Sequence, residues 1–122
     1  MKKLILVVLF LCAASWLLAA EVNKKWTAPA NDDALVATGP VDAYDLRYST
    51  TPITPENFEQ AIQLPTGEPK APGEVEQYTF DLPADAHYYF AIKSIDHAGN
   101  VSLISNTVEQ DFFAPGAISD LE

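Results

Sequence analysis

The feature that most constrains the fold is residues 82–106, LPADAHYYFAIKSIDHAGNVSLISN. From position 88 onward the side chains alternate between two sets with a period of two, which is the pattern of a strand that buries one face. Tyr88, Phe90 and Ile92 form the face that is expected to point into a core. The segment therefore predicts a half-buried β-strand.

A turn interrupts this alternation directly after the predicted strand. The Asp96 side chain can accept hydrogen bonds from backbone amides, while Gly99 and Asn100 accept positive φ, so these residues are expected to close a hairpin. Residues 101–108 follow as a second predicted strand. The DHAGN sequence is explained by this turn alone, and no Arg-Gly-Asp motif occurs in the chain.

The residues before Tyr88 predict a lock between two sheets. Leu82 and Pro83 form a corner that leads into the tyrosine, whose hydroxyl is then expected to hydrogen-bond to the backbone of the preceding loop. With this corner, residues 82–106 resemble the last two strands of a fibronectin type III domain, of the kind common in bacterial secreted proteins. The resemblance implies an all-β fold, an immunoglobulin-like antiparallel β-sandwich.

The upstream sequence extends the resemblance strand by strand. Trp26 resembles the tryptophan that ends the family's second strand and fills the core between the sheets. Residues 41–50 resemble the third strand, residues 60–64 a short edge strand, and residues 75–82 the next strand. Their alternation places six residues inward: Tyr44, Leu46, Tyr48, Tyr78, Phe80 and Leu82.

The chain departs from the family at its first strand, which is missing from its usual place ahead of Trp26. By alternation with Trp26, Val22 and Lys24 are expected to point inward, although a lysine is a poor core residue. The domain, taken as residues 21–112, is therefore predicted to be incomplete there and to expose a sheet edge that can pair with another chain. Residues 113–122 resemble the first strand of a following domain. Residues 114–122 could thus pair with the vacant edge of a neighbouring copy, and this contact, repeated head to tail, would give a filament.

Residues 1–20 predict a secretory signal peptide, because a basic start is followed by an apolar run and small residues. Cleavage is expected after Ala20, with Ala14 as an alternative site. Lipid attachment at Cys12 or retention as an uncleaved anchor are less favoured readings. The protein is therefore expected to be secreted or extracellular, with the periplasm or the cell surface as possible destinations.

The charge of the exported chain limits its partners. Removal of residues 1–20 takes away Lys2 and Lys3, leaves five Lys and Arg against seventeen Asp and Glu, and lowers the formal charge from −10 to −12. Nucleic acids and anionic membranes require cationic contacts, so we expect neither as a partner. Cys12 is the only cysteine, so packing rather than a disulfide must stabilise the exported domain.

No catalytic, cofactor or metal site is predicted. Asn31, Asp32 and Asp33 could hold calcium through their oxygens, but a solvated turn explains them better, because the regular acid spacing of a calcium loop is missing. His87 and His97 have no cysteine or histidine-rich motif beside them that would indicate zinc. The resemblance also implies no enzymatic activity.

Three functional hypotheses remain open at this point. The first is a non-catalytic secreted or cell-surface module for adhesion or for binding protein or carbohydrate. The second is a strand-exchanging structural subunit that associates with itself through the exposed edge. The third is a fragment of a larger secreted protein, such as a carbohydrate-active enzyme. A carbohydrate site would need an exposed aromatic platform, for which the candidates are Tyr89, Phe112 and Phe113.

Overall fold

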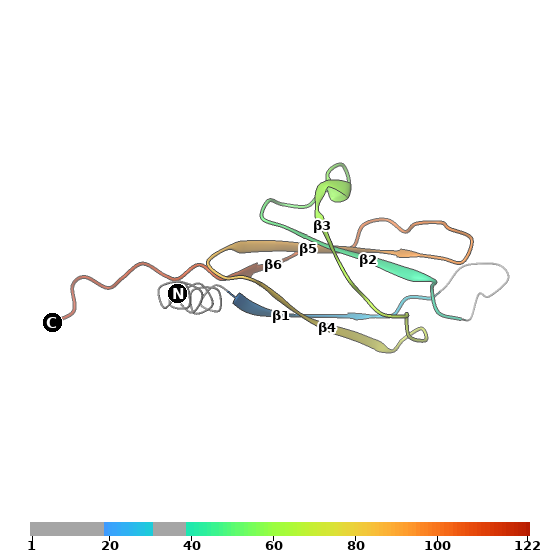
Figure 1. The fold of residues 1–122 in the computed structure, drawn as a ribbon, viewed down its shortest axis with the longest axis horizontal. Coiled ribbons are helices and arrows are strands. Elements are labelled where there is room, and N and C mark those ends of the chain that lie inside the picture. The colour runs from blue at the N-terminus through green and yellow to red at the C-terminus, as the bar shows by residue number, and fades with distance from the viewer. Residues whose placement is uncertain (1–18, 31–38) are drawn as a thin grey trace, which may run out of the picture.

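The computed structural model describes residues 19–30 and 39–122. These residues form two antiparallel sheets that lie over one another as two layers (Figure 1). The smaller sheet pairs β1 (Ala19–Thr27) with β4 (Val75–Pro83). The larger sheet has the order β3-β2-β5-β6, formed by β2 (Ala43–Ser49), β3 (Ile62–Leu64), β5 (His87–Ile95) and β6 (Val108–Asp111). A short 3-10 turn, η1 (Phe58–Gln60), precedes β3, and the predicted all-β sandwich is confirmed.

The core lies between the two sheets and is built from the faces that alternation placed inward. Register explains this, because Leu46 lies opposite Ile92 and Tyr48 opposite Phe90, so side chains of β2 and β5 share one face. The buried cluster consists of Val22, Leu46, Leu64, Leu82, Tyr88 and Phe90. Half-buried aromatic and aliphatic side chains close it at the margins, namely Trp26, Tyr48, Phe80, Ile92 and Phe112.

The predicted corner is present between β4 and β5. The Tyr88 hydroxyl donates a hydrogen bond to the Pro83 carbonyl, five residues back in the chain. The loop between them carries Asp85 at φ 58°, the one positive-φ residue other than glycine in residues 19–30 and 39–122. An aspartate tolerates this left-handed conformation better than most residues. The alternation of side chains does not indicate this left-handed conformation at Asp85.

The hairpin turn forms as predicted at two of its three positions. Asp96 Oδ1 accepts the backbone amides of Ala98 at 3.0 Å and Asn100 at 2.8 Å, and Gly99 has φ 87°. The prediction of positive φ at Asn100 is wrong. Instead, its side-chain amide donates to Asp96 Oδ2 at 3.1 Å, so Asn100 stabilises the turn through its side chain.

The prediction of a regular strand over residues 101–108 is also wrong. Val101 forms only an isolated bridge, and regular pairing begins at Val108 in β6. Between them, the hydroxyl oxygens of Ser102 and Ser105 accept the backbone amides of Ser94 and Ile92, at 2.9 and 3.0 Å. These hydroxyls stand where backbone carbonyls would pair in a regular ladder, which is how serine competes with sheet structure.

Two predictions fall outside the described residues. One is the predicted leader, of which only the last two residues are described. The other is the possible calcium site formed by Asn31, Asp32 and Asp33. β1 begins at Ala19, so cleavage after Ala20 would remove its first two positions. Residues 113–122 form neither helix nor strand. Over the ranges that the structure describes, no helix has the length and apolar character needed to cross a bilayer.

Candidate functional site

The outer edge of β1 is the most unusual feature of the small sheet. β1 pairs only with β4 among the described residues, which leaves its other edge without a neighbouring strand. The Ala28 amide donates to the Glu74 carbonyl at 2.8 Å, so the backbone groups of Ala28 point toward the β4 side. This bond sets which residues of β1 point their backbone groups toward β4. Because bonding alternates along an antiparallel strand, the backbone groups that point to the open edge belong to Glu21, Asn23, Lys25 and Thr27.

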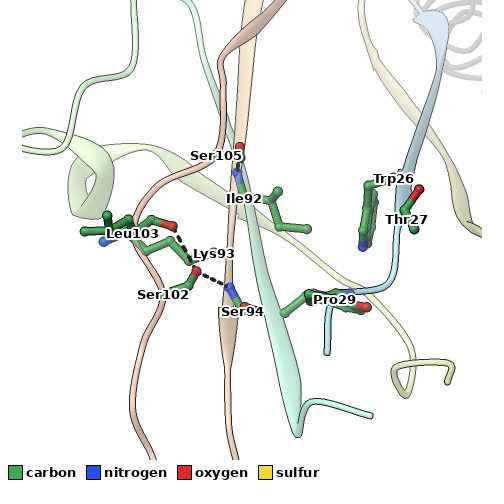
Figure 2. A pocket seen from close by; sticks show the side chains of 10 residues that line it. Trp26, Thr27, Pro29, Ile92, Lys93, Ser94, Ser102, Leu103 and Ser105 are labelled. Carbon is green, nitrogen blue, oxygen red and sulfur yellow. Dashed lines mark hydrogen bonds between the residues drawn. The ribbon is translucent and has the colours of Figure 1, made fainter. Parts of the chain in front are cut away.

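A groove runs beside this edge, between β1 and the segment that links β5 to β6. It consists of a hollow of about 210 Å³ and another of about 140 Å³, which share Trp26, Ile92 and Ser105 in their walls. Figure 2 shows the larger hollow, with Trp26 and Pro29 on the β1 side and Ile92 of β5 pointing toward Trp26. We call this the open-side groove, lined by Lys24, Trp26, Pro29, Ile92, Ser105 and Val108.

Lys24 spans the two sheets within this groove. Its Nζ atom donates to Gln110 Oε1 of β6 at 3.1 Å and lies 4.3 Å from the centre of the Phe90 ring. Burial lowers the pKa of Lys24, because the charged ammonium is partly withdrawn from water. The inward position that alternation predicts for Lys24 is thus confirmed, and it places a half-buried cation at an otherwise apolar surface. Lys25 is exposed on the outer face.

The opposite edge of the small sheet is covered by the connection from β3 to β4, which Figure 1 shows crossing from one layer to the other. The Gly67 amide donates to the Tyr78 hydroxyl at 2.9 Å, and the Lys70 amide donates to Glu76 Oε2 at 2.7 Å. Glu76 is only 1% exposed, so this bond satisfies a buried carboxylate. Glu76 was not predicted to be buried, although alternation along β4 places it on the same inward face as Tyr78.

An aromatic cluster joins the two sides at the pole where β1 ends. The Trp26 ring stacks on Tyr78 with 5.5 Å between centroids and meets Tyr44 edge-on at 5.1 Å. Burial raises the pKa of Tyr44 to about 12, because the phenolate would be desolvated, and the nearby Glu76 charge adds to the rise. The Trp26 ring therefore forms a rigid wall of the open-side groove.

The three aromatic residues predicted as a carbohydrate platform do not lie together. Tyr89 packs on the outer face of the larger sheet against Phe58, in a separate apolar cluster. Phe112 packs on Tyr88, with ring centroids 6.1 Å apart, at the margin of the main core. Only Phe113 is largely exposed, at 56%. Tyr89 and Phe112 therefore face opposite sides of the larger sheet, the three candidates form no single exposed platform, and carbohydrate binding stays a prediction.

The two histidines lie apart, each beside one acid. His87 Nε2 is 3.5 Å from Glu109, and His97 Nδ1 is 3.1 Å from Asp42. Within the part of the chain that is described, no three His, Cys, Asp or Glu side chains group as metal ligands would. Neither histidine lines the open-side groove, whose polar lining residues include Lys24, Lys25, Asn106 and Ser105.

Comparison with known proteins found no match to a family model, to a curated protein or to a solved structure. The open edge and the groove beside it are therefore the features from which a function can be inferred. Together they offer unpaired backbone groups in a row and an apolar channel parallel to them. This combination suits an extended peptide segment better than a compact small molecule.

Proposed function

We propose that the chain is an exported, non-catalytic fibronectin type III-like module that binds protein by accepting an extended segment as a new strand on β1. The strand arrangement supports the family assignment. In this proposal β1 and β4, which pair with each other, are strands B and E of an immunoglobulin-like sandwich, and β2, β5 and β6, which are neighbours in the larger sheet, are strands C, F and G. The Tyr88 bond to Pro83 is the corner typical of such domains.

The observation that carries the proposal is the open edge of β1 beside the open-side groove. The outward backbone groups of Glu21, Asn23, Lys25 and Thr27 can pair with any extended segment, which gives affinity without sequence preference. The groove next to them selects among segments, because Trp26 offers an apolar contact surface. Adhesion and attachment functions need this kind of contact and no reactive group.

The amino-acid sequence supports the part of the proposal that concerns export. The basic start and apolar run of residues 1–20 are those of a secretory leader, and the acidic remainder suits a protein partner rather than nucleic acid. Expression of the whole chain in a bacterium tests this part. The exported protein should have the mass expected for cleavage after Ala20, and a purified chain that retains residues 1–20 would contradict it.

A selection of random displayed nonapeptides on the purified chain tests strand addition. Asn23 and Thr79 are register partners, yet Asn23 turns its backbone amide to the open edge and Thr79 turns its amide to the opposite edge. Proline removes that amide in either position. Selected peptides should bind Thr79→Pro and lose binding to Asn23→Pro by about tenfold or more. Equal binding to both variants, or no enriched peptide, would show that β1 does not accept strands.

A further inference from the structure

We infer that the strand accepted by β1 is residues 113–122 of a second copy, paired antiparallel so that Ile118 lies opposite Trp26 and Asp120 opposite Lys24. This inference rests on the proposed function and names its partner. It predicts a head-to-tail contact in which each copy donates at one pole and accepts at the other. Such a contact does not close on itself, so it builds an open chain of copies.

The donor segment has apolar side chains that find no cover in their own copy. Ile118 is 80% exposed and Leu121 is 88% exposed, in a stretch with neither helix nor strand. Figure 1 shows this stretch running away from the sandwich beyond β6. An extended segment with bare backbone and bare apolar side chains is in the form that an open sheet edge binds.

The direction of the strands selects a second copy as the donor. Ala19 lies opposite Pro83 and His87 opposite Asp111, so β1 begins at the same pole where β6 ends. An antiparallel partner of β1 must enter at the other pole and run toward Ala19. In its own copy, the segment would first have to cross the nine residues of β1, about 30 Å, before pairing could start. A neighbour stacked against that pole delivers the segment directly.

The register follows from which side chains face the groove. Lys24 and Trp26 point inward, and residues directly opposite in an antiparallel pair point to the same face. Ile118 opposite Trp26 therefore enters the apolar part of the open-side groove. Asp120 then lies beside the Lys24 ammonium, which is half withdrawn from water and gains most from a carboxylate at this place.

Charge adds to this match in a strongly acidic chain. Five of the charged residues after position 20 are cations, and two of them, Lys24 and Lys25, are adjacent on β1. Arg47 and Lys93 lie instead over Phe58 on the outer face of the larger sheet. The segment itself carries Asp120 and Glu122 and no cation, so it complements the one edge strand with paired lysines.

Disulfide trapping in the full chain tests the register. In this pairing Ser119 lies opposite Lys25 on the outer face, at a Cα separation of about 5.5 Å that a disulfide can bridge. A Cys12→Ser chain with Lys25→Cys and Ser119→Cys should oxidise to a ladder of covalent multimers. The control carries Gln77→Cys with Ser119→Cys, because Gln77 is the register partner of Lys25 on β4. The control should remain monomeric under the same oxidation, and equal ladders in both would overturn the register.

Sedimentation velocity over a range of concentrations tests the association itself. Asp120→Lys places a second cation beside Lys24 and should weaken self-association by about tenfold. Glu68→Lys makes the same change of charge at an exposed site away from the groove and should leave it unaltered. A wild-type chain that stays monomeric at every concentration would overturn the inference. Nonapeptides that still depend on the Asn23 amide would then leave the proposed function standing.

Discussion

The two edges of the small sheet differ in what the chain places beside them. At the β4 edge, the connection from β3 lays backbone amides on Tyr78 and Glu76, and a buried carboxylate receives its hydrogen bond. Neither edge has a further strand among the described residues, and at the β1 edge a half-buried lysine bridges the two layers. Both edges belong to one two-stranded sheet, so the strands themselves do not explain the difference between the edges. The segment that covers the β4 edge explains it.

This difference distinguishes the covered edge, which has a structural role, from the open edge, which can bind a partner. At the covered edge, the side chains of Tyr78 and Glu76 and the Val75 carbonyl have partners in the connection from β3, so a ligand there would have to displace bonds that the fold already makes. Backbone groups at the open edge have no strand partner among the described residues, so a docking strand displaces no bond of the fold and gives up only hydrogen bonds to solvent, at little net loss. The same physics that makes an open edge a hazard makes it a binding site when a specific segment fits it.

The largest expected effect is at the covered edge. Tyr78→Ala should lower the free energy of unfolding by about 3 kcal/mol, because it removes the stacking on Trp26 and on Phe80 together with the bond to Gly67. Tyr78→Phe keeps the ring and loses only that bond, which should cost about 1 kcal/mol. Urea unfolding measures both. If the two substitutions cost the same, the bond to the loop, rather than the ring, holds this edge.

Most of the fold could be predicted because its signal is local. Alternation with a period of two identifies the inward faces of β2, β4 and β5, and a period of two is a property of neighbouring residues. The Pro83 and Tyr88 corner is equally local. The prediction failed where the outcome depends on a contact between segments. Ser102 and Ser105 interrupt the pairing with β5 only because their hydroxyls reach the amides of β5. The sequence of residues 101–108 alone does not contain this information.

The candidate site was predictable in part. The inward Lys24 and the missing first strand pointed to an exposed edge, since both follow from counting positions back from Trp26. The groove itself was not predicted, because its walls come from β1, β5 and the segment after β5, and only the three-dimensional arrangement joins them. The placement of the aromatic candidates could not be predicted for the same reason. Tyr89 and Phe112 are close to strand ends in the sequence, but they face opposite sides of the larger sheet.

An intermediate effect is expected at Tyr44, which lies between the two edges. Its pKa is raised from 10.0 to about 12, so the folded state holds the phenol proton more tightly than the unfolded state does. This stabilisation is present below pH 10 and is lost as the pH rises toward 12, with a magnitude of about 2 kcal/mol. Comparison of wild type with Tyr44→Phe by urea unfolding across this range isolates it. A difference between the two proteins that does not change with pH would contradict the burial of this hydroxyl.

The smallest effect is expected at Lys24 on the open edge. Lys24→Met should change the free energy of unfolding by less than about 1 kcal/mol at neutral pH, since the lost bond to Gln110 is offset by relief of a partly desolvated charge. The pKa of Lys24 is lowered in the folded state, so the unfolded chain binds more protons just below 10.5, and the stability of wild type relative to Lys24→Met should rise with pH there. Lys25→Met, which removes the same charge from the exposed face, is the control, and all three proteins are compared by urea unfolding at a concentration where they are monomeric. A relative stability of wild type that falls with rising pH would mean that the ammonium is stabilised by its neighbours, and the open edge would then be as well satisfied as the covered one.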